Sequence, residues 1–243
     1  MLDANELERY KRQIKLIGIK AQEKIKASKV LVVGVGGLGS IVSFYLAAVG
    51  IGNITIIDRD KVILSNLNRQ VLYNIDDLGK DKVFVAKDKL EKFNPNVNIT
   101  AIKSEISRSL LDDVVPSVDV AVDCLDNWKS RLILNDICVK HMKPLVHGGV
   151  RGLNGQVMTI IPKKTACLRC LIKEPKDEEK EIPIIGPIVG IIGSLQALEA
   201  IKIIVGIGDL LAGRLLIYDG YSVDFETVEV RRRKNCPACG ENL

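Results

Sequence analysis

A strand, a glycine-rich turn, a helix and a second strand follow one another between residues 29 and 58, and this order constrains the fold more than any other feature. Residues 29–34 (KVLVVG) form a short apolar run, and residues 54–58 (ITIID) form a second one. β-Branched runs of this length are typical of buried strands. Residues 40–50, between them, have the apolar content of a helix. Two strands joined through a helix form a βαβ unit with parallel strands and a right-handed crossover, so we predict an α/β fold.

The same alternation continues along the chain. Further helices are expected over residues 3–27, 82–93, 128–141 and 190–205, and further strands over residues 97–102, 118–123, 144–148, 156–161, 214–218 and 222–228. The first half is therefore typical of a doubly wound, Rossmann-like sheet, and the later strands are typical of antiparallel pairing. We predict a mixed sheet within a single domain, residues 1–243, in which the charged stretch 173–181 is a loop.

Composition narrows the functional classes. Hydrophobic residues make up 47% of the chain, enough for a large core, and the net charge is a mild +5. The basic run at residues 231–234 has no aromatic residues interleaved with it, which argues against nucleic-acid binding. Residues 1–16 carry charges throughout and lack the apolar centre of a signal peptide, and no window reaches the ~18 uninterrupted apolar residues of a membrane span. We expect a cytoplasmic protein without membrane contact.

The glycine-rich turn, residues 34–39 (GVGGLG), predicts a phosphate-binding element. Glycines let a ligand approach the backbone, and the start of the following helix presents free N–H groups with a partial positive charge. Asp58 ends the second strand, about 20 residues downstream, where an acid binds ribose hydroxyls. This pattern alone indicates a nucleotide without saying which one, so a nicotinamide or flavin dinucleotide stays open at this point.

A polar segment beyond Asp58 favours a different nucleotide chemistry. Residues 65–70 (SNLNRQ) are rich in amides, where a dehydrogenase normally has a crossover helix with an apolar face. Arg69 offers a planar fork for phosphate oxygens, and Lys82 begins another predicted helix. Asp126, in the segment VDCLDN, follows a predicted parallel strand, and a carboxylate in that place near phosphates suits Mg²⁺.

Several longer motifs carry a resemblance that covers essentially the whole chain. They are RYKRQI, GVGGLGS, IIDRD, SNLNRQ, VDCLDN, CLRC, GSLQALEAIK and CPAC. With them the sequence resembles the E1-like adenylyltransferases of the MoeB, ThiF and HesA types, relatives of ubiquitin-activating enzymes. The resemblance implies that ATP and Mg²⁺ are used to adenylate the C-terminal glycine of a small ubiquitin-like sulfur-carrier protein that ends in Gly-Gly. It also implies an acyl-adenylate and pyrophosphate as products, and later sulfur transfer from a sulfur donor protein.

The resemblance further implies roles for individual residues. It implies that Arg12 reaches the phosphates in the partner subunit, and therefore that the enzyme is a homodimer. In the family, the residue matching Gly37 lies against the nucleotide and the residue matching Asp58 holds the ribose. The implied catalytic residues are Asp126, Arg69, Lys82 and Arg12, and the implied nucleotide and Mg²⁺ ligands are Gly37, Asp58, Asn66, Arg69, Lys82, Asp126 and Asn127.

Two CxxC pairs predict a structural zinc site. Cys167 and Cys170 form one pair, and Cys236 and Cys239 form the other. Four thiolates at such spacing suit tetrahedral Zn²⁺ and leave no open coordination position, so the metal is expected to be structural. The two pairs are far apart in sequence, so zinc would clip the C-terminal end to the middle of the chain. A disulfide or redox pair is the alternative.

The remaining cysteines and histidines are expected to be structural. Many members of the family carry a cysteine after the first CxxC, but residues 171–185 contain none. We therefore expect the reaction to stop at the adenylate and sulfur transfer to be left to another protein. Cys124 and Cys138 are expected to be packing residues, and His147 a hydrogen-bonded loop residue, with substrate contact as its alternative.

Three other functions are compatible with parts of the sequence. An NAD-dependent oxidoreductase fits the glycine turn and Asp58, but it leaves SNLNRQ and the cysteine pairs unexplained. A non-enzymatic scaffold would not need Arg69, Lys82 and Asp126. An E1-like enzyme acting on tRNA or on a peptide is a neighbouring hypothesis. The carrier could serve molybdopterin or thiamine synthesis, tRNA thiolation or protein modification, since the chemistry is the same in each.

Overall fold

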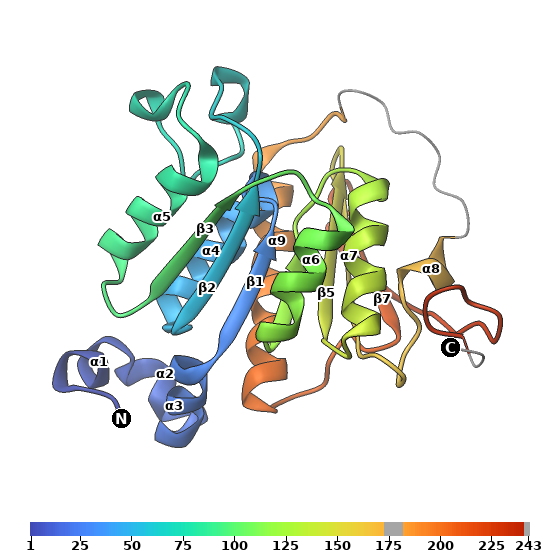
Figure 1. Ribbon diagram of the computed structural model, residues 1–243, viewed down its shortest axis with the longest axis horizontal. Coiled ribbons are helices and arrows are strands. Elements are labelled where there is room, and N and C mark those ends of the chain that lie inside the picture. Colours follow the sequence, from blue (N-terminus) through green and yellow to red (C-terminus); the bar gives the residue numbers. More distant parts are fainter. Residues whose placement is uncertain (173–181, 241–243) are drawn as a thin grey trace.

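One eight-stranded sheet runs through the computed structural model, which describes residues 1–172 and 182–240 (Figure 1). Its strand order is β3-β2-β1-β4-β5-β6-β7-β8; the first five of these are parallel, and β6, β7 and β8 are antiparallel to their neighbours. The strands are β1 (Lys29–Val33), β2 (Asn53–Asp58), β3 (Asn98–Lys103), β4 (Val120–Asp123), β5 (Leu145–Arg151), β6 (Asn154–Ile160), β7 (Arg214–Asp219) and β8 (Asp224–Glu229). The predicted doubly wound, mixed sheet is confirmed.

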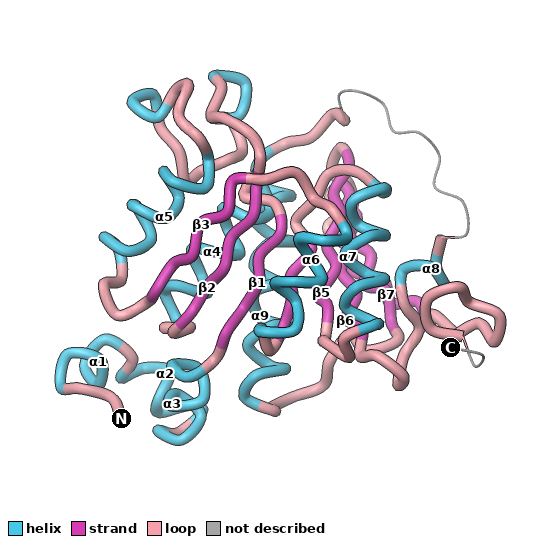
Figure 2. Tube along the Cα trace, viewed as in Figure 1, coloured by secondary structure: helices cyan, strands magenta, loops and turns pink. Residues whose placement is uncertain are grey.

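Helices cover both faces of the sheet (Figures 1 and 2). α4, α5 and α9 pack on one face, whereas α6 and α7 pack on the other, so that two hydrophobic cores form with the sheet between them. The α-helices are α1 (Ala4–Arg9), α2 (Lys11–Ile17), α3 (Ile19–Ala27), α4 (Gly37–Val49), α5 (Lys82–Phe93), α6 (Arg108–Val114), α7 (Trp128–Lys140), α8 (Leu168–Leu171) and α9 (Gly186–Val205).

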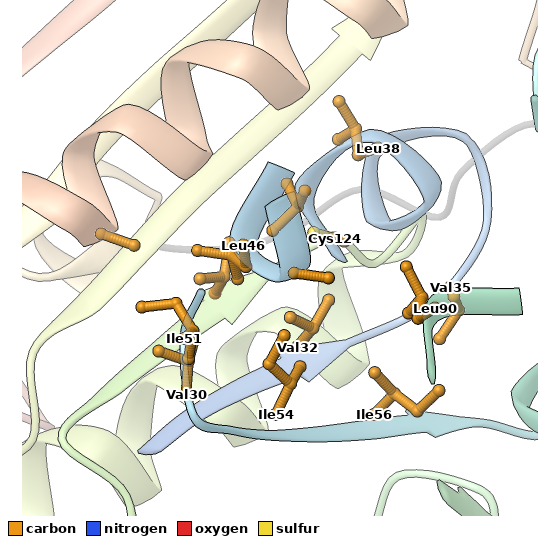
Figure 3. Packing of buried hydrophobic residues seen from close by; sticks show 14 of the residues in the cluster. Val30, Val32, Val35, Leu38, Leu46, Ile51, Ile54, Ile56, Leu90 and Cys124 are labelled. Carbon is orange, nitrogen blue, oxygen red and sulfur yellow. The ribbon is translucent and has the colours of Figure 1, made fainter. Parts of the chain in front are cut away.

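The central strand β1 contributes to both cores. Val30 and Val32 belong to the core beneath α4, and Leu31 and Val33 to the core on the other face; all four side chains are fully buried. Figure 3 shows Val30 and Val32 beside Ile54 of β2 in the first core. A parallel strand covered on both sides must be apolar at every position, which explains the unbroken run that first indicated the fold.

The strand order reverses between β1 and β4. The chain passes from β1 to β2 and β3 on one side, then returns to place β4 against the other side of β1. In such sheets the loops that leave the two central strands diverge, and ligands bind in the crevice outside their carboxyl ends. The glycine-rich turn follows β1, and the segment containing Asp126 follows β4, so both predicted ligand-binding segments flank this point.

Some predicted elements differ in their ends. The helix predicted over 3–27 is three helices, because the chain turns at Tyr10 and again at Gly18, whose φ of 83° ends α2. α9 begins at Gly186, earlier than predicted, because a proline is tolerated in the first turn of a helix. α6 and α8 were not predicted from the sequence. The loop expected at 173–181 lies outside the described residues.

α9 is a core helix. By length and composition alone, it is the one helix in the described part of the chain that is apolar enough to cross a membrane. It packs against α4 and the sheet, and it carries two buried polar side chains, Gln196 and Glu199. Thr159 Oγ1 and the backbone N–H of Leu211 donate hydrogen bonds to the Glu199 carboxylate, at 2.5 and 2.8 Å. These bonds tie α9 to β6 and to the segment before β7.

Tyr10 attaches the N-terminal helices to the rest of the fold. Its side chain is buried, and its hydroxyl accepts a hydrogen bond of 2.9 Å from Nδ2 of Asn94, which also donates to the carbonyl of Ala47 at 2.7 Å. A Cβ atom at Gly50 would lie 2.5 Å from the Tyr10 ring, so a glycine there makes room for it. The carboxyl ends of α4 and α5 therefore hold the N-terminal helices in place.

We expect Tyr10→Phe to lower the free energy of unfolding by about 1 kcal/mol, because one buried hydrogen bond is lost while the ring still fills its site. The control is Tyr45→Phe, at a half-exposed tyrosine on α4, which should change stability by less than ~0.5 kcal/mol. Urea unfolding of both variants measures the difference. Equal stability of the two variants would contradict the role given to Tyr10.

Candidate active site and metal centre

The glycine-rich turn is held by close backbone contacts that no side chain could enter. Gly34 has a φ of 89°, and a Cβ atom there would lie 2.7 Å from the carbonyl oxygen of Cys124. A Cβ atom at Gly39 would lie 1.9 Å from the carbonyl oxygen of Gly34. α4 begins directly after Gly36, which provides no side-chain cap, so its first N–H groups are left to a ligand or to water.

Asp58 fixes the turn from the neighbouring strand. Its Oδ2 accepts a hydrogen bond from the N–H of Val35 at 2.7 Å, and its Oδ1 accepts one from the N–H of Asp60 at 2.8 Å. The hydroxyl of Tyr73 donates to the carbonyl of Val35 at 2.7 Å. Burial raises the pKa of the Asp58 carboxyl, and the charge of Lys82 opposes that rise. The acid predicted to bind ribose therefore also contacts the phosphate-binding turn.

Lys82 lies at the same edge of the sheet. It starts α5, its side chain is only 4% exposed, and its Nζ lies 3.0 Å from Oδ2 of Asp60. Asp60 is itself half exposed, so this ion pair is open to solvent on one side. The structure thus places the predicted phosphate-binding lysine close to Asp58, in a fixed position and beside an acid that the sequence analysis did not single out.

The amide-rich segment borders this crevice. The side chain of Arg69 is partly exposed, and its Nη1 donates to the carbonyl of Ser65 and to Oδ1 of Asn68, each at 2.9 Å. Asn66 is buried, and its Oδ1 accepts a hydrogen bond from the N–H of Ile63 at 3.4 Å. The predicted role of Asn66 as a nucleotide ligand stays a prediction, because in this structure its side chain holds the loop.

Gln70 has an unpaired polar atom next to the glycine turn. Its side chain is 4% exposed, its Nε2 would lie 3.6 Å from a Cβ atom at Gly36, and its Oε1 has no hydrogen-bond donor among the described residues. A buried oxygen without a donor is unfavourable unless a ligand or water supplies one. This atom therefore fits a polar ligand lying over the turn.

Asp126 projects from the turn that follows β4. It is exposed, and Nδ2 of Asn127 donates to its Oδ1 at 3.2 Å. Oδ1 of Asn127 accepts a hydrogen bond from the N–H of Ser130 and so caps α7. The hydrogen bond from Arg59 to Glu105 raises the pKa of the guanidinium, and the charge of Asp126 adds to the rise.

One predicted site residue, Arg12, lies elsewhere, and another, Gly37 at the start of α4, packs against a helix. Arg12 is exposed on α2, at the amino end of β1, whereas the glycine turn lies at the carboxyl end (Figure 2). Arg12 therefore does not reach the crevice of its own chain. Gly37 faces α9: a Cβ atom there would lie 2.8 Å from Val189, so this glycine lets two helices approach closely. Contact between Gly37 and a nucleotide stays a prediction.

A buried chain of polar groups lies beneath the Asp126 turn. Nδ1 of His147 is 2.7 Å from Oδ2 of Asp123, and both side chains are fully buried. Oδ1 of Asp123 accepts a hydrogen bond from the N–H of Leu125 at 3.1 Å, and Nε2 of Gln156 lies 3.1 Å from the other ring nitrogen of His147. The sequence analysis did not find this chain. Its one local signal was an aspartate at the last position of a buried apolar strand.

Two further side chains hold the same turn. Arg131 of α7 donates to the carbonyl of Leu125 from Nε at 3.1 Å and from Nη2 at 2.5 Å, and its Nε is 3.9 Å from Oδ2 of Asp123. Nε2 of Gln196 on α9 donates to the carbonyl of Asp123 at 2.7 Å. Side chains from both faces of the sheet therefore meet at the end of β4.

The expectation that His147 is a loop residue was wrong. It lies within β5, because the two following glycines, Gly148 and Gly149, continue the strand and leave space for side chains from α9, α7 and β6. The expectation of a hydrogen-bonded histidine was correct. Burial lowers the pKa of His147, and its bond to Asp123 opposes this shift. The ring packs 5.8 Å from the ring of Trp128, beside the site.

The four paired cysteines come together at the other end of the molecule. Their sulfur atoms all lie within 4.8 Å of one another; Cys167 and Cys236 are 3.7 Å apart, and Cys170 and Cys239 are 3.5 Å apart. A Zn–S length of about 2.3 Å in tetrahedral geometry sets sulfurs about 3.8 Å apart, so the cluster fits zinc. A Cβ atom at Gly240 would lie 2.6 Å from the Cys236 carbonyl, which explains the glycine after the last cysteine.

The other two cysteines are packed in the cores. Cys124 lies in the core beneath α4 (Figure 3), and Cys138 lies in the core on the other face. Burial raises the pKa of both thiols. Neither is therefore a thiolate at neutral pH, as a nucleophile would need to be.

We expect each chain to bind one zinc ion. The variant Cys236→Ser should contain less zinc, and its unfolding temperature should fall by about 5 °C or more. Cys138→Ala is the control and should keep its zinc. Bound zinc is also expected to be released as the pH falls, because protons compete with the metal for the thiolates. Metal analysis and thermal unfolding measure this, and a stable, zinc-free wild-type protein would contradict it.

Comparisons with known proteins agree with this arrangement. The ThiF family model matches residues 10–238. The sulfur carrier protein ThiS adenylyltransferase of Escherichia coli is 39% identical over 96% of this chain and 94% of the relative. The SAMP-activating enzyme E1 of Haloferax volcanii is 40% identical over 99% of this chain and 91% of the relative. A crystal structure of E. coli MccB with ATP superimposes with a TM-score of 0.88, at 29% identity, over 98% of this chain and 75% of that chain. The chain therefore belongs to the ThiF family and is an E1-like adenylyltransferase.

Proposed function

We propose that this enzyme, acting as one domain over residues 1–243, uses ATP to adenylate the C-terminal glycine of a small ubiquitin-like sulfur-carrier protein. One observation carries the proposal. The glycine turn, Asp58, Lys82 and Asp126 converge from β1, β2, α5 and β4 on the point where the strand order reverses. The relatives named for activating a sulfur carrier or SAMP are 39% and 40% identical to this chain, whereas MccB is 29% identical, which favours a carrier protein over another substrate.

Each group in the crevice suits one part of ATP. Asp58 would accept hydrogen bonds from the ribose hydroxyls, while the N–H groups at the start of α4 would bind phosphate oxygens. Lys82 is fixed by Asp60 at 3.0 Å, and a fixed cation needs little reorganisation when negative charge develops beside it. Arg69 would bind phosphate with its planar fork once it leaves the carbonyl of Ser65.

Asp126 is the residue that would hold Mg²⁺. It is exposed at the end of β4, and oxygen ligands from carboxylates are those that Mg²⁺ prefers. Its neighbour Asn127 has its own Oδ1 engaged in capping α7, which leaves its Nδ2 to orient the Asp126 carboxylate. Bound Mg²⁺ would neutralise charge on the phosphates and orient them.

The reaction needs no side-chain nucleophile. One oxygen of the carrier's C-terminal carboxylate attacks the α-phosphorus of ATP, the bond from this phosphorus to the bridging oxygen breaks, and pyrophosphate leaves. The products are an acyl-adenylate and pyrophosphate. The chain positions the two reactants and supplies fixed positive charge, which are the two largest sources of acceleration in such a step. We propose that a sulfur donor protein then consumes the adenylate, since residues 171–185 contain no cysteine.

ATP–pyrophosphate exchange tests the proposal with a panel of carriers that end in Gly-Gly. We expect exchange that requires one carrier and Mg²⁺, and a loss of at least about a hundredfold in Asp126→Ala. Cys124→Ala is the control and should retain exchange, because that thiol is buried in the core. Exchange that is normal in Asp126→Ala would remove this residue from the reaction. ATP binding without exchange for any carrier would overturn the proposed substrate.

We also propose a homodimer in which Arg12 completes the partner's site. Arg12 lies at the end of the sheet opposite to its own crevice, so it can act on phosphates only in another chain. α1 to α3 are fixed by the buried Tyr10, so they form a rigid support for it.

Mixing two inactive variants tests this arrangement. Arg12→Ala and Asp126→Ala should each be inactive alone. After subunit exchange at equal amounts, half of the dimers are mixed and each has one intact site, so about a quarter of the wild-type activity should return. Pyrophosphate exchange before and after mixing measures the recovered activity. Lys11→Ala, at the neighbouring exposed residue of the same helix, is the control for Arg12→Ala. No recovery, in a mixture shown by mass to contain mixed dimers, would contradict the shared site.

A further inference from the structure

A buried hydrogen-bond chain lies directly beneath the turn that carries Asp126. It runs from Gln156 on β6 through His147 on β5 to Asp123 on β4. We propose that His147 is a positioning residue: through Asp123 it fixes the backbone of the turn, and so places Asp126 in the crevice. This inference rests on the proposed role of Asp126, but the state of the turn itself can be measured without any reaction.

The partners of His147 determine which of its nitrogens carries the proton. The amide nitrogen of Gln156 faces Nε2 at 3.1 Å and can only donate, so Nε2 must be the acceptor. A neutral ring then has its hydrogen on Nδ1, which donates to Oδ2 of Asp123 at 2.7 Å. The lowered pKa of the buried ring agrees with the neutral form. His147 therefore supplies Asp123 with a donor of fixed direction.

Asp123 passes this constraint to the turn. With Oδ2 bound to His147, its Oδ1 is directed at the N–H of Leu125, 3.1 Å away. The carbonyl of Leu125 is bound in turn by Arg131 of α7. Both backbone polar groups of Leu125, the residue just before Asp126, are therefore held by buried side chains. They belong to the two peptide units on either side of the Leu125 Cα, so rotation of either unit would break one of these contacts.

The position of Asp126 depends on the fixed backbone of the turn, because few contacts hold its own side chain. It is exposed, and Asn127, the adjacent residue, supplies the one side-chain hydrogen bond to it among the described residues. A carboxylate on a loose turn would have to be ordered each time a ligand binds, whereas one on a fixed turn is already in place. The direction of the Asp126 side chain is thus set by the backbone beneath it.

The surroundings are built for these polar groups. A Cβ atom at Gly148 would lie 2.2 Å from Gln196, and one at Gly149 would lie 3.2 Å from Gln156. Both glycines of β5 thus admit long polar side chains from neighbouring elements into a buried space. A histidine needed only to fill volume would not require buried polar side chains such as Gln156 and Gln196 beside it.

Two variants of nearly equal shape separate positioning from packing. His147→Asn and His147→Leu both lose the outer part of the ring and the contact with Gln156. In Asn, the amide nitrogen is the same number of bonds from Cα as Nδ1 of histidine, so this variant keeps a donor for Asp123, whereas Leu has none. Any difference between the two variants therefore reports the hydrogen bond to Asp123 and not the lost volume.

The first measurement is made on the protein without nucleotide or Mg²⁺. Hydrogen exchange followed by NMR should show the Leu125 amide exchanging about tenfold faster in His147→Leu than in His147→Asn, for one lost hydrogen bond. Trp128, the single tryptophan of the chain, packs on His147 and is a local probe. Both variants lose the ring on which Trp128 packs, so its emission serves to check that the surroundings of residue 147 are otherwise alike in the two proteins. Equal Leu125 exchange in the two variants would overturn the proposal.

The second measurement is ATP–pyrophosphate exchange with the carrier. We expect kcat in His147→Leu to be about tenfold below that of His147→Asn, with KM for ATP changed less than about twofold, since Asp126 acts on the reacting phosphates and not on the ribose. The Mg²⁺ concentration for half-maximal rate should rise in parallel. Unequal Leu125 exchange with equal kcat would show that the turn does not position Asp126. If wild-type protein shows no exchange, the proposed function fails while the Leu125 result still decides whether His147 holds the turn.

Asp123→Asn provides a second route if His147→Leu does not fold, because it leaves no unpaired buried charge. The two donors face different oxygens of the Asp123 carboxylate, and asparagine has an oxygen at one of these positions and an NH₂ group at the other. It therefore cannot accept from both His147 Nδ1–H and the N–H of Leu125 at these positions. We expect faster Leu125 exchange and a lower kcat in this variant too. Unchanged Leu125 exchange in folded Asp123→Asn would contradict the proposal as clearly as the first comparison would.

Discussion

The close contact between the ends of β1 and β4 is the constraint on which the rest of the site depends. At Gly34 the backbone passes so near the carbonyl of Cys124 that a Cβ atom would be 2.7 Å from it, and Gly39 lies closer still to Gly34, where a Cβ atom would be 1.9 Å from the carbonyl oxygen. The glycine turn, the start of α4 and the turn after β4 are therefore fixed relative to one another. Because the strand order reverses here, this contact also lies at the base of the crevice.

Two carboxylates, one half-buried and one fully buried, stabilise this junction in the same way. Asp58 binds the N–H of Val35 in the first turn, and Asp123 binds the N–H of Leu125 in the second. Each acid has a partner that offsets its burial: Lys82 acts on Asp58 through its charge, and His147 donates to Asp123. Buried charges that bind backbone N–H groups give fixed geometry, and the site uses this rigidity to hold its exposed groups.

The cysteine cluster that fits zinc lies at the other end of the molecule. It brings the segment after β6 beside the segment after β8, so that four sulfur atoms from the two ends of the antiparallel extension lie together. No nucleotide-binding residue belongs to it. The candidate nucleotide site therefore lies at the parallel centre of the sheet and the candidate metal site at its antiparallel end. β5, the strand between them, carries His147.

The sequence by itself determined the α/β class, the parallel first half, the nucleotide-binding turn with Asp58, and the cysteine set, because local spacing of apolar residues, glycines and thiols is sufficient for each. The tertiary structure alone decided which side chains meet. The chain of polar groups at the end of β4 comes from five separate elements, and no local sequence pattern predicts these contacts. Its members are Asp123, His147, Gln156, Arg131 and Gln196. The tertiary structure also decided that Arg12 lies away from its own crevice, since the direction of the N-terminal helices is set by the fit of Tyr10 against Gly50 and Asn94, contacts that are distant in sequence.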